Sequence, residues 1–346
     1  MVQRSDGALY WAGTTPLTTS SDTPFIAAST PGSFSATIGS SYLACAIDPN
    51  GAVWCAGSNS EGQLGAGLSP SSVSSSTIPE EVVTSVGGPA LANIVQVSVD
   101  GDEGYAACAV DTSGNVWCWG YGYYGVIGNG YENNSTFAVP VMVGGAQLTG
   151  VTQISVAYDH ACALKSDGTL WCWGYNYYGQ IGQGTSGSGT YEYYLAPVQV
   201  QALYNDVTGV SVGVDFSCAL TSDTTVSCWG YNGSGVLGNG TATGTATVPA
   251  QVLTAASGGT AFSGVLEIQV GSWESNDVCA LKSGGALWCW GSGVGSTYVP
   301  APYVQSSFPV TDIYLLCSNG AGGPSFLDDT GSFNYENYKP TQISCP

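Results

Sequence analysis

The stretch CALKSDGTLWCWG, residues 162–174, decides the fold of this 346-residue chain. Apolar residues alternate with polar ones on both sides of a Ser-Asp-Gly turn, a pattern that predicts a β-hairpin. Cys162 and Cys172 are ten positions apart, and the midpoint between them is Asp167 in the turn. The two cysteines therefore face each other across the hairpin. Their Cβ atoms are expected roughly 4.5–5.5 Å apart, which local twist can close for a disulfide.

The same hairpin recurs along the chain. Five copies keep both cysteines at this spacing, and we expect a disulfide within each: Cys45 with Cys55, Cys108 with Cys118, Cys162 with Cys172, Cys218 with Cys228, and Cys279 with Cys289. Zinc is the alternative for paired cysteines, but structural zinc sites use the shorter C-x₂-C spacing. Two further copies lack cysteines: MVQRSDGALYWAG from Met1 and SFLDDTGSFNYEN from Ser325.

Each copy after the first is preceded by an alternating apolar run such as VTQISVAY, from Val151, which reads as the buried inner strand of a blade. Gly-rich turns and a further short strand follow each hairpin. Four antiparallel strands per unit, with units starting near 1, 45, 108, 162, 218, 279 and 325, predict an all-β fold. We expect one seven-bladed β-propeller over residues 1–346.

The ends of the chain are expected to close the ring. The first copy starts at its hairpin and lacks an inner strand, whereas residues 341–344 spell TQIS, the letters found at 152–155. A closing strand at 341–345, beside the N-terminal hairpin, would remove the exposed sheet edges. Cys317 and Cys345 fall on neighbouring inner strands in this alignment, which predicts a sixth disulfide.

Charge and cysteine content restrict the environment. Four basic residues against 24 acidic ones give a net charge of −20, which argues against nucleic acid and anionic membrane surfaces as partners. The chain has no run of 18 apolar residues that could span a membrane. Twelve cysteines that pair without remainder indicate an oxidising compartment, so we expect an extracellular or cell-surface protein. Residues 1–13 lack the apolar core of a signal peptide, so a removed leader is expected.

Catalytic and cofactor motifs are weak in this sequence. His160 is the single histidine and is expected to bond within its blade, and no G-x-S-x-G motif accompanies it. The glycines of 120–125 match G-x-G-x-x-G but follow a hairpin strand with no helix behind them, so they form a propeller turn. The acids Asp100, Asp102 and Glu103 suit a solvated loop better than calcium. We expect no enzyme, no cofactor and no metal site.

Tyrosines gather in the loops between strands. Tyrosine supplies contact area at small entropic cost, so these are candidate interaction residues, with packing against neighbouring blades as the alternative. The candidates are Tyr121, Tyr123, Tyr124, Tyr175, Tyr177, Tyr178, Tyr191, Tyr193 and Tyr194. Glycosylation sequons start at Asn133, Asn134, Asn232 and Asn239, where chance in a Ser/Thr-rich chain is the alternative.

The unit CALKSDGTLWCWGYNYYGQIGQG, from Cys162, resembles the repeat of the regulator of chromosome condensation family, which carries a CAL…DG…WGxNxxGQLG pattern. The last element recurs at Leu64, Ile127, Ile181 and Leu237. The resemblance implies a seven-bladed propeller. The founding nuclear member is a guanine-nucleotide exchange factor that binds chromatin, but this chain lacks a basic tail and is rich in cysteine, so exchange activity is not carried over. It looks more similar to secreted, cysteine-paired bacterial members, one of which is an enzyme inhibitor.

The function expected from these features is a non-enzymatic extracellular scaffold that binds protein. Self-assembly into a fibre or surface layer is one variant, which fits a chain rich in Tyr, Asn, Ser and Thr. A secreted inhibitor or receptor-like binder is the first alternative. A carbohydrate-binding protein that uses the tyrosine loops is the second.

Overall fold

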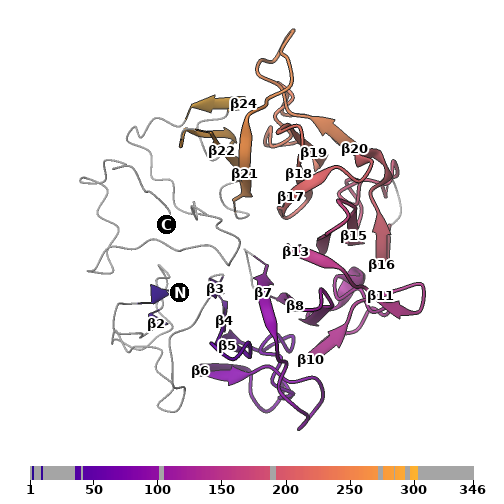
Figure 1. Cartoon of the computed structure of the whole chain (residues 1–346). Helices are drawn as coiled ribbons and strands as arrows, with labels where there is room; N and C mark the ends of the chain where they lie inside the picture. The colour runs from indigo at the N-terminus through magenta and orange to yellow at the C-terminus, as the bar shows by residue number, and fades with distance from the viewer. Residues whose placement is uncertain are drawn as a thin grey trace.

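The computed structural model describes residues 42–100, 105–187, 192–271, 276–283, 285–292 and 297–302, and the backbone of three short strands at 2–3, 9–10 and 36–39. These parts of the chain contain five antiparallel sheets of four strands each. The sheets follow one another around a common centre (Figure 1).

Each four-stranded sheet is a simple meander along the chain. The first comprises β3 (Ala36–Gly39), β4 (Leu43–Ile47), β5 (Val53–Ser58) and β6 (Ser75–Glu81). The second comprises β7 (Ile94–Val99), β8 (Ala106–Asp111), β9 (Val116–Gly120) and β10 (Ser135–Pro140). The third comprises β13 (Val151–Val156), β14 (His160–Lys165), β15 (Leu170–Tyr175) and β16 (Tyr193–Gln199).

The last two sheets repeat this order. The fourth comprises β17 (Val207–Val212), β18 (Phe216–Thr221), β19 (Val226–Tyr231) and β20 (Thr245–Gln251). The fifth comprises β21 (Val265–Val270), β22 (Asp277–Lys282), β23 (Leu287–Gly291) and β24 (Thr297–Pro302). Short 3₁₀ turns η1 (Tyr123–Gly125) and η2 (Gln201–Leu203) and the small hairpin β11 (Met142–Val143) to β12 (Ala146–Gln147) lie between sheet strands.

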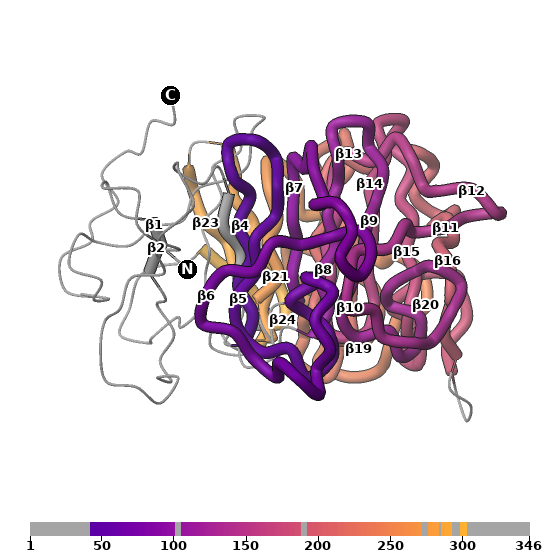
Figure 2. Tube along the Cα trace, turned by 90° about the horizontal axis from the view of Figure 1, so that it is seen from below, coloured from indigo at the N-terminus to yellow at the C-terminus, as the bar shows by residue number. Residues whose placement is uncertain are grey.

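The first strand of each sheet lies nearest the centre and the fourth lies at the periphery (Figure 1). Strands such as β4, β7 and β13 run between two faces of the molecule, as the side view in Figure 2 shows. One face carries the connections from first to second and from third to fourth strand, and we call it the loop face. The other carries the tight turns between second and third strands, and we call it the hairpin face.

Five disulfides join the second and third strands of the five sheets. Cys162 pairs directly with Cys172 in the ladder of β14 and β15, at a Cα–Cα distance of 4.1 Å. The other bonds have the same register: Cys45–Cys55, Cys108–Cys118, Cys218–Cys228 and Cys279–Cys289. The spacing of ten residues places each pair opposite because the turn is centred midway between them. No described cysteine is left unbonded.

Trp173 connects its sheet to the preceding one, and Gly174, the next residue, allows a close backbone approach within its own sheet. Trp173 is fully buried, and its indole N–H donates to the carbonyl oxygen of Val126 in the preceding sheet, at 2.7 Å. Gly174 has a φ of +102°, and a Cβ there would lie 2.3 Å from the carbonyl oxygen of Asp159. Only glycine fits this position, because both the backbone conformation and the space exclude a side chain.

Side chains of the inner strands also bond to the next sheet. The amide group of Gln96 donates to the carbonyl of Ile154 at 3.0 Å and accepts from its N–H at 2.9 Å. Gln153 makes the same pair of bonds with Val210, one sheet further on. These contacts satisfy backbone groups that the inner edge of each sheet exposes, so they fix each sheet relative to its neighbour.

The predictions of an all-β fold and of four-stranded repeat units are confirmed for the five cysteine-bearing copies. Near the N-terminus, β1 (Val2–Gln3) pairs with β2 (Leu9–Tyr10), with Val2 opposite Tyr10. In the next copy of the repeat, Ala46 and Trp54 occupy the same two positions and are also opposite each other. The copy at 325, the closing strand at 341–345 and the Cys317–Cys345 bond lie outside the described residues, so seven blades and ring closure stay predictions.

Candidate functional site: a tyrosine belt above buried carboxyl groups

Ten tyrosines form a continuous chain of ring contacts on the loop face. Neighbouring rings have centroid distances between 4.6 Å, for Tyr124 and Tyr175, and 6.5 Å, for Tyr123 and Tyr124. We call this surface the tyrosine belt; it comprises Tyr105, Tyr121, Tyr123, Tyr124, Tyr158, Tyr175, Tyr177, Tyr178, Tyr193 and Tyr231. Its members come from the second, third and fourth sheets, so it bridges two boundaries between sheets.

Exposure separates the belt into a packed part and an open part. Tyr121 is partly buried and packs against the apolar core of the second sheet, as the packing alternative expects. In contrast, Tyr123 is 57% exposed, and Tyr177 and Tyr231 are each 39% exposed. These three side chains are held by neighbouring rings yet leave much of their surface open to a partner.

The sequence identified seven of the ten belt residues. Tyr194 is a candidate that lies outside the ring contacts; it packs against the cores of two sheets, and its hydroxyl donates to Glu192 at 3.2 Å. Tyr191 lies outside the described residues. Tyr105, Tyr158 and Tyr231 were missed, although the repeat register gives a signal: Tyr105 stands three positions before the first cysteine of its hairpin, at the loop face.

Three aspartates lie beneath the belt and come from the loops between first and second strands. Asp100 is fully buried and its carboxylate accepts the backbone N–H of Tyr105 at 2.9 Å. Asp159 is 4% exposed and Asp215 is partly exposed. Burial and then the nearby charge of Asp100 raise the pKa of Asp159 well above its usual range. Burial and then the charge of Asp159 raise the pKa of Asp215 to about 7.

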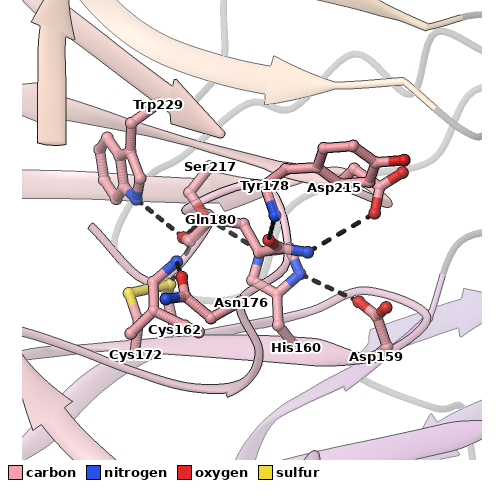
Figure 3. A network of polar contacts seen from close by, with 11 residues as sticks. Asp159, His160, Cys162, Cys172, Asn176, Tyr178, Gln180, Asp215, Ser217 and Trp229 are labelled. Carbon is pink, nitrogen blue, oxygen red and sulfur yellow. Dashed lines mark hydrogen bonds and ion pairs between the residues drawn. A yellow bond between two sulfur atoms is a disulfide. The ribbon is translucent and has the colours of Figure 1, made fainter. Parts of the chain in front are cut away.

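His160 lies between these aspartates in a network of polar contacts that Figure 3 shows. Its Nε2 atom is 2.9 Å from the hydroxyl of Ser217, and its Nδ1 atom is 3.6 Å from Asp159. The Ser217 hydroxyl donates to the carbonyl oxygen of Gln180 at 2.9 Å, so it accepts from Nε2 of the histidine. Burial lowers the pKa of His160 to about 4, so the ring is neutral at neutral pH.

This serine, histidine and aspartate are arranged in the order of a hydrolase triad but lack its chemistry. Ser217 and His160 have no exposed surface, and the hydroxyl proton is committed to a backbone carbonyl of the neighbouring sheet. A nucleophilic serine instead needs its proton on the histidine and its oxygen open to substrate. The trio therefore links the third and fourth sheets: the role of His160 is structural, as expected, but its bond runs to the next sheet and not within its own blade, as the sequence had predicted.

The asparagine of the repeat motif has a structural role that bears on one sequon. Asn232 is 1% exposed; its Oδ1 accepts the N–H of Leu237, and its Nδ2 donates to the loop around Thr241. Its amide nitrogen is therefore unavailable for glycosylation in the folded chain. Asn133 and Asn134 are exposed, and Asn134 donates to Glu61 of the preceding sheet at 2.6 Å. Asn239 is partly exposed and stays a candidate.

The remaining motifs form no second site. The glycines of 120–125 end β9 and enter η1, where Gly125 packs on the backbone of Leu195, as expected for a propeller turn. Asp102 and Glu103 lie outside the described residues. Within the part of the chain that the structure describes, no cluster of histidine, cysteine or carboxylate side chains has the grouping of a metal site. The same part contains no helix long and apolar enough to cross a membrane.

The meander sheets around a common centre and the tryptophan hydrogen bonds repeated between them define a repeat β-propeller. Comparison with known families identifies the repeat: models of the regulator of chromosome condensation (RCC1) repeat match residues 113–164 and 167–220, and, for a second model, 151–180 and 207–236. Residues 113–236 of the chain therefore match repeats of the regulator of chromosome condensation family.

Curated relatives carry such repeats in larger proteins. Human E3 ubiquitin-protein ligase HERC2 is 32% identical over 257 residues, which cover 70% of this chain and 5% of HERC2. The ultraviolet-B receptor UVR8 of Arabidopsis thaliana is 28% identical over 196 residues, which cover 56% of this chain and 40% of the receptor. The chain thus spans less than half of either relative, and their activities are not transferred to it.

Solved structures agree on the fold. Human WBSCR16 superposes with a TM-score of 0.63 and 23% identity, covering 78% of this chain and 67% of that protein. Prp20p of Saccharomyces cerevisiae, a protein studied for its binding to Gsp1p and histones, superposes with a TM-score of 0.61 and 20% identity, covering 78% and 63% of the two chains. At these identities the likeness concerns the fold alone.

Proposed function

We propose that this propeller is a non-enzymatic scaffold that binds a protein partner through the tyrosine belt. The observation that carries the proposal is the continuity of the belt: ten rings from three sheets touch in sequence, and several expose a third or more of their surface. Tyrosine combines a rigid apolar ring with a hydroxyl, and interfaces are enriched in it for this reason.

The scaffold beneath the belt supports this proposal because it is rigid. Each of the three sheets has a disulfide across its central strands, and buried side-chain bonds join each sheet to the next. Loops on such a framework lose little conformational entropy when a partner binds, so more of the contact energy appears as affinity.

The location that we propose is extracellular or at the cell surface. Five disulfides within one chain are expected in an oxidising compartment and are rare in reducing ones. Self-assembly into a larger structure is the variant in which the partner is a second copy of this chain, and the experiment below distinguishes it.

The test places a photo-cross-linking amino acid, p-benzoylphenylalanine, at position 123 or 231 of the belt. The control position is 204, because Tyr204 is 88% exposed but lies at the hairpin face. Irradiation is carried out with the secreted proteins of the producing organism, and adducts are identified by mass spectrometry. We expect one discrete adduct from the belt positions and none from position 204. An adduct with a second copy of the chain identifies self-assembly.

The identified protein is then purified and its affinity is measured against variants. Tyr123→Ser combined with Tyr177→Ser should weaken binding by at least tenfold, since each exposed tyrosine of an interface contributes roughly 1–2 kcal/mol. Tyr204→Ser should leave the affinity within twofold. A partner that binds the belt variant as tightly as the wild type would refute the proposal.

A further inference from the structure

The loop face carries negative charge that no described basic residue neutralises. Asp159 and Asp215 lie beneath the belt, and each raises the pKa of nearby groups, including the tyrosines Tyr175 and Tyr178. His160, which lies beside them, is neutral because burial holds its pKa at about 4. At neutral pH the polar floor of the belt therefore contains carboxyl groups that make each other's ionisation less favourable, and no positive charge within the described residues.

The described lysines lie on the opposite face. Lys165 ends β14 at the hairpin turn, where its Nζ is 4.0 Å from Asp167. Lys282 ends β22 at the equivalent turn, with its Nζ 4.6 Å from the ring centre of Phe262. A strand of six residues separates each lysine from the loop face, roughly 20 Å at 3.3 Å per residue. Neither ammonium group can reach the aspartates beneath the belt.

A second observation is hydrogen-bonding capacity beneath the belt that the described residues leave unused. Among the described residues, Asp159 Oδ1 and His160 Nδ1 are buried side-chain atoms without a hydrogen-bond donor or acceptor in reach. They are 3.6 Å apart, which is too long for a hydrogen bond between them. From the described part of the chain, the side chain of Asp215 accepts one long hydrogen bond, from Gln180 Nε2 at 3.5 Å. The carboxyl groups therefore have acceptor capacity that the described chain leaves unused, and Asp215 is the one that solvent reaches.

We propose that the belt recognises an arginine-bearing segment of its partner protein, with the guanidinium group seated over Asp215 and against the belt tyrosines. The proposal rests on the proposed function, since it specifies the chemistry of the partner at the same surface. Guanidinium stacks on aromatic rings and donates paired hydrogen bonds to a carboxylate, so it matches both groups at once. A net charge of −20 adds long-range attraction for such a segment.

Binding of the arginine should depend on pH, because Asp215 and the groups that face it can gain or lose protons. These groups are Asp159 and His160 from the neighbouring loop and Tyr175 and Tyr178 from the belt. The tyrosines stay protonated because burial raises their pKa, and the histidine stays neutral above about pH 4. With the pKa of Asp215 at about 7, the ionised fraction rises roughly tenfold from pH 6 to pH 8. Arginine binding should strengthen across the same interval.

The test measures binding of the peptide Ac-Gly-Arg-Gly-Arg-Gly-NH₂ to the intact chain by calorimetry. A peptide with citrulline in place of arginine is the neutral control. The protein variants are Asp215→Asn and Asp223→Asn, which remove one charge each from the same sheet, the first at the loop face and the second at the hairpin face. The variant Tyr177→Ser measures how much the tyrosine belt contributes to binding of the peptide.

We expect the citrulline peptide and the Asp215→Asn variant each to weaken binding at pH 8 by at least tenfold, and Asp223→Asn to change it less than twofold. The wild type should bind about tenfold more weakly at pH 6 than at pH 8, and Asp215→Asn should lose that difference. Equal effects of the two aspartate variants would overturn the inference, because attraction would then reflect net charge alone. Loss of binding with Tyr177→Ser but not with Asp215→Asn would overturn it while leaving the proposed function intact.

Discussion

Replacing Asp215 by asparagine is expected to raise the stability of the folded chain at alkaline pH. Asp215 has a pKa of about 7 in the folded state against 3.8 in the unfolded chain. Between pH 3.8 and about pH 7, Asp215 stays protonated in the folded state but is ionised in the unfolded chain. The free energy of unfolding therefore falls as the pH rises through this range. The full pKa difference corresponds to roughly 4 kcal/mol at 1.36 kcal/mol per unit, and solvent contact reduces the expected effect to about 2 kcal/mol.

The assay is urea unfolding followed by tryptophan fluorescence at pH values from 4.5 to 8.5. Asp215→Asn should match the wild type closely at pH 4.5 and exceed it by about 2 kcal/mol at pH 8.5. The comparison between proteins is needed because His160 acts in the opposite direction: its lowered pKa makes the folded state gain stability as pH rises from about 4 to 6.5. Asp159, whose pKa is also raised, acts in the same direction as Asp215.

Asp223→Asn is the matched control. Its carboxylate accepts bonds from the N–H and hydroxyl of Thr225 and the hydroxyl of Thr221, and hydrogen bonds to Thr221 and Thr225 lower its pKa. Above pH 4.5 this group is ionised in both states, so the variant should differ from the wild type by a constant amount. A constant difference between wild type and Asp215→Asn over the same range would show that Asp215 is not held in a repelling environment.

Three further predictions concern the framework. Gly174→Ala should cost roughly 2–4 kcal/mol of stability in thermal or urea unfolding, because its Cβ would lie 2.3 Å from a backbone oxygen; Gly184→Ala shares the positive φ but its Cβ would make only an ordinary contact with Val248 at 3.7 Å, and should cost about 1–2 kcal/mol. Replacing Cys218 and Cys228 together by alanine should lower the free energy of unfolding by about 2–3 kcal/mol, and an unchanged melting temperature would contradict this. Ser217→Ala should cost about 1–3 kcal/mol, since the buried histidine loses its partner; a neutral effect would show that this bond does not contribute.

The hairpins could be predicted because their determinants are local. A turn centred midway between Cys162 and Cys172 fixes which residues are opposite, and the same ten-residue spacing in five copies makes the register unambiguous. The disulfides then follow from geometry alone. The network of His160 could be predicted only in part, since its partner Ser217 stands 57 positions away in the next sheet. Contacts between sheets depend on how neighbouring copies are placed, which the repeat pattern does not specify by itself.

The sequon at Asn232 shows how one pattern can conceal another. Asn-Gly-Ser satisfies the acceptor rule for glycosylation, but the same asparagine occupies the repeat position held by Asn59 and Asn176. All three are buried, and each accepts the N–H of the residue five positions later: Leu64, Ile181 or Leu237. A comparison of Asn232 with the asparagines at the same position in the other copies would have distinguished it from the exposed pair at 133 and 134.

The expectation of a solvated loop was wrong for Asp100, which is fully buried, and Asp159 and Asp215 were missed because the significance of the three aspartates depends on each other. Asp159 stands between Tyr158 and His160 and Asp215 between Val214 and Phe216, and these neighbours do not show which groups of the next sheet each carboxyl group faces. Both pKa shifts arise from the low dielectric and from repulsion between groups on neighbouring sheets. The belt likewise depends on contacts between neighbouring sheets, since the ring centroids of Tyr178 and Tyr231 are 4.8 Å apart across a sheet boundary.

The residue three positions before the first cysteine of each hairpin serves the framework with its backbone and the loop face with its side chain. This position holds Tyr42, Tyr105, Asp159, Asp215 and Asn276 in the five sheets. In each of the five sheets, the backbone carbonyl at this position accepts an N–H at 2.8–3.1 Å from the residue that follows the glycine of the third strand, the position of Gly174 in the third sheet. This bond uses no side-chain atom, so the framework imposes no requirement on the side chain that projects from it. The side chain is therefore set by what the loop face contacts: Tyr105 joins the belt, and Asp215 is the partly exposed carboxyl group over which we propose that a guanidinium is seated.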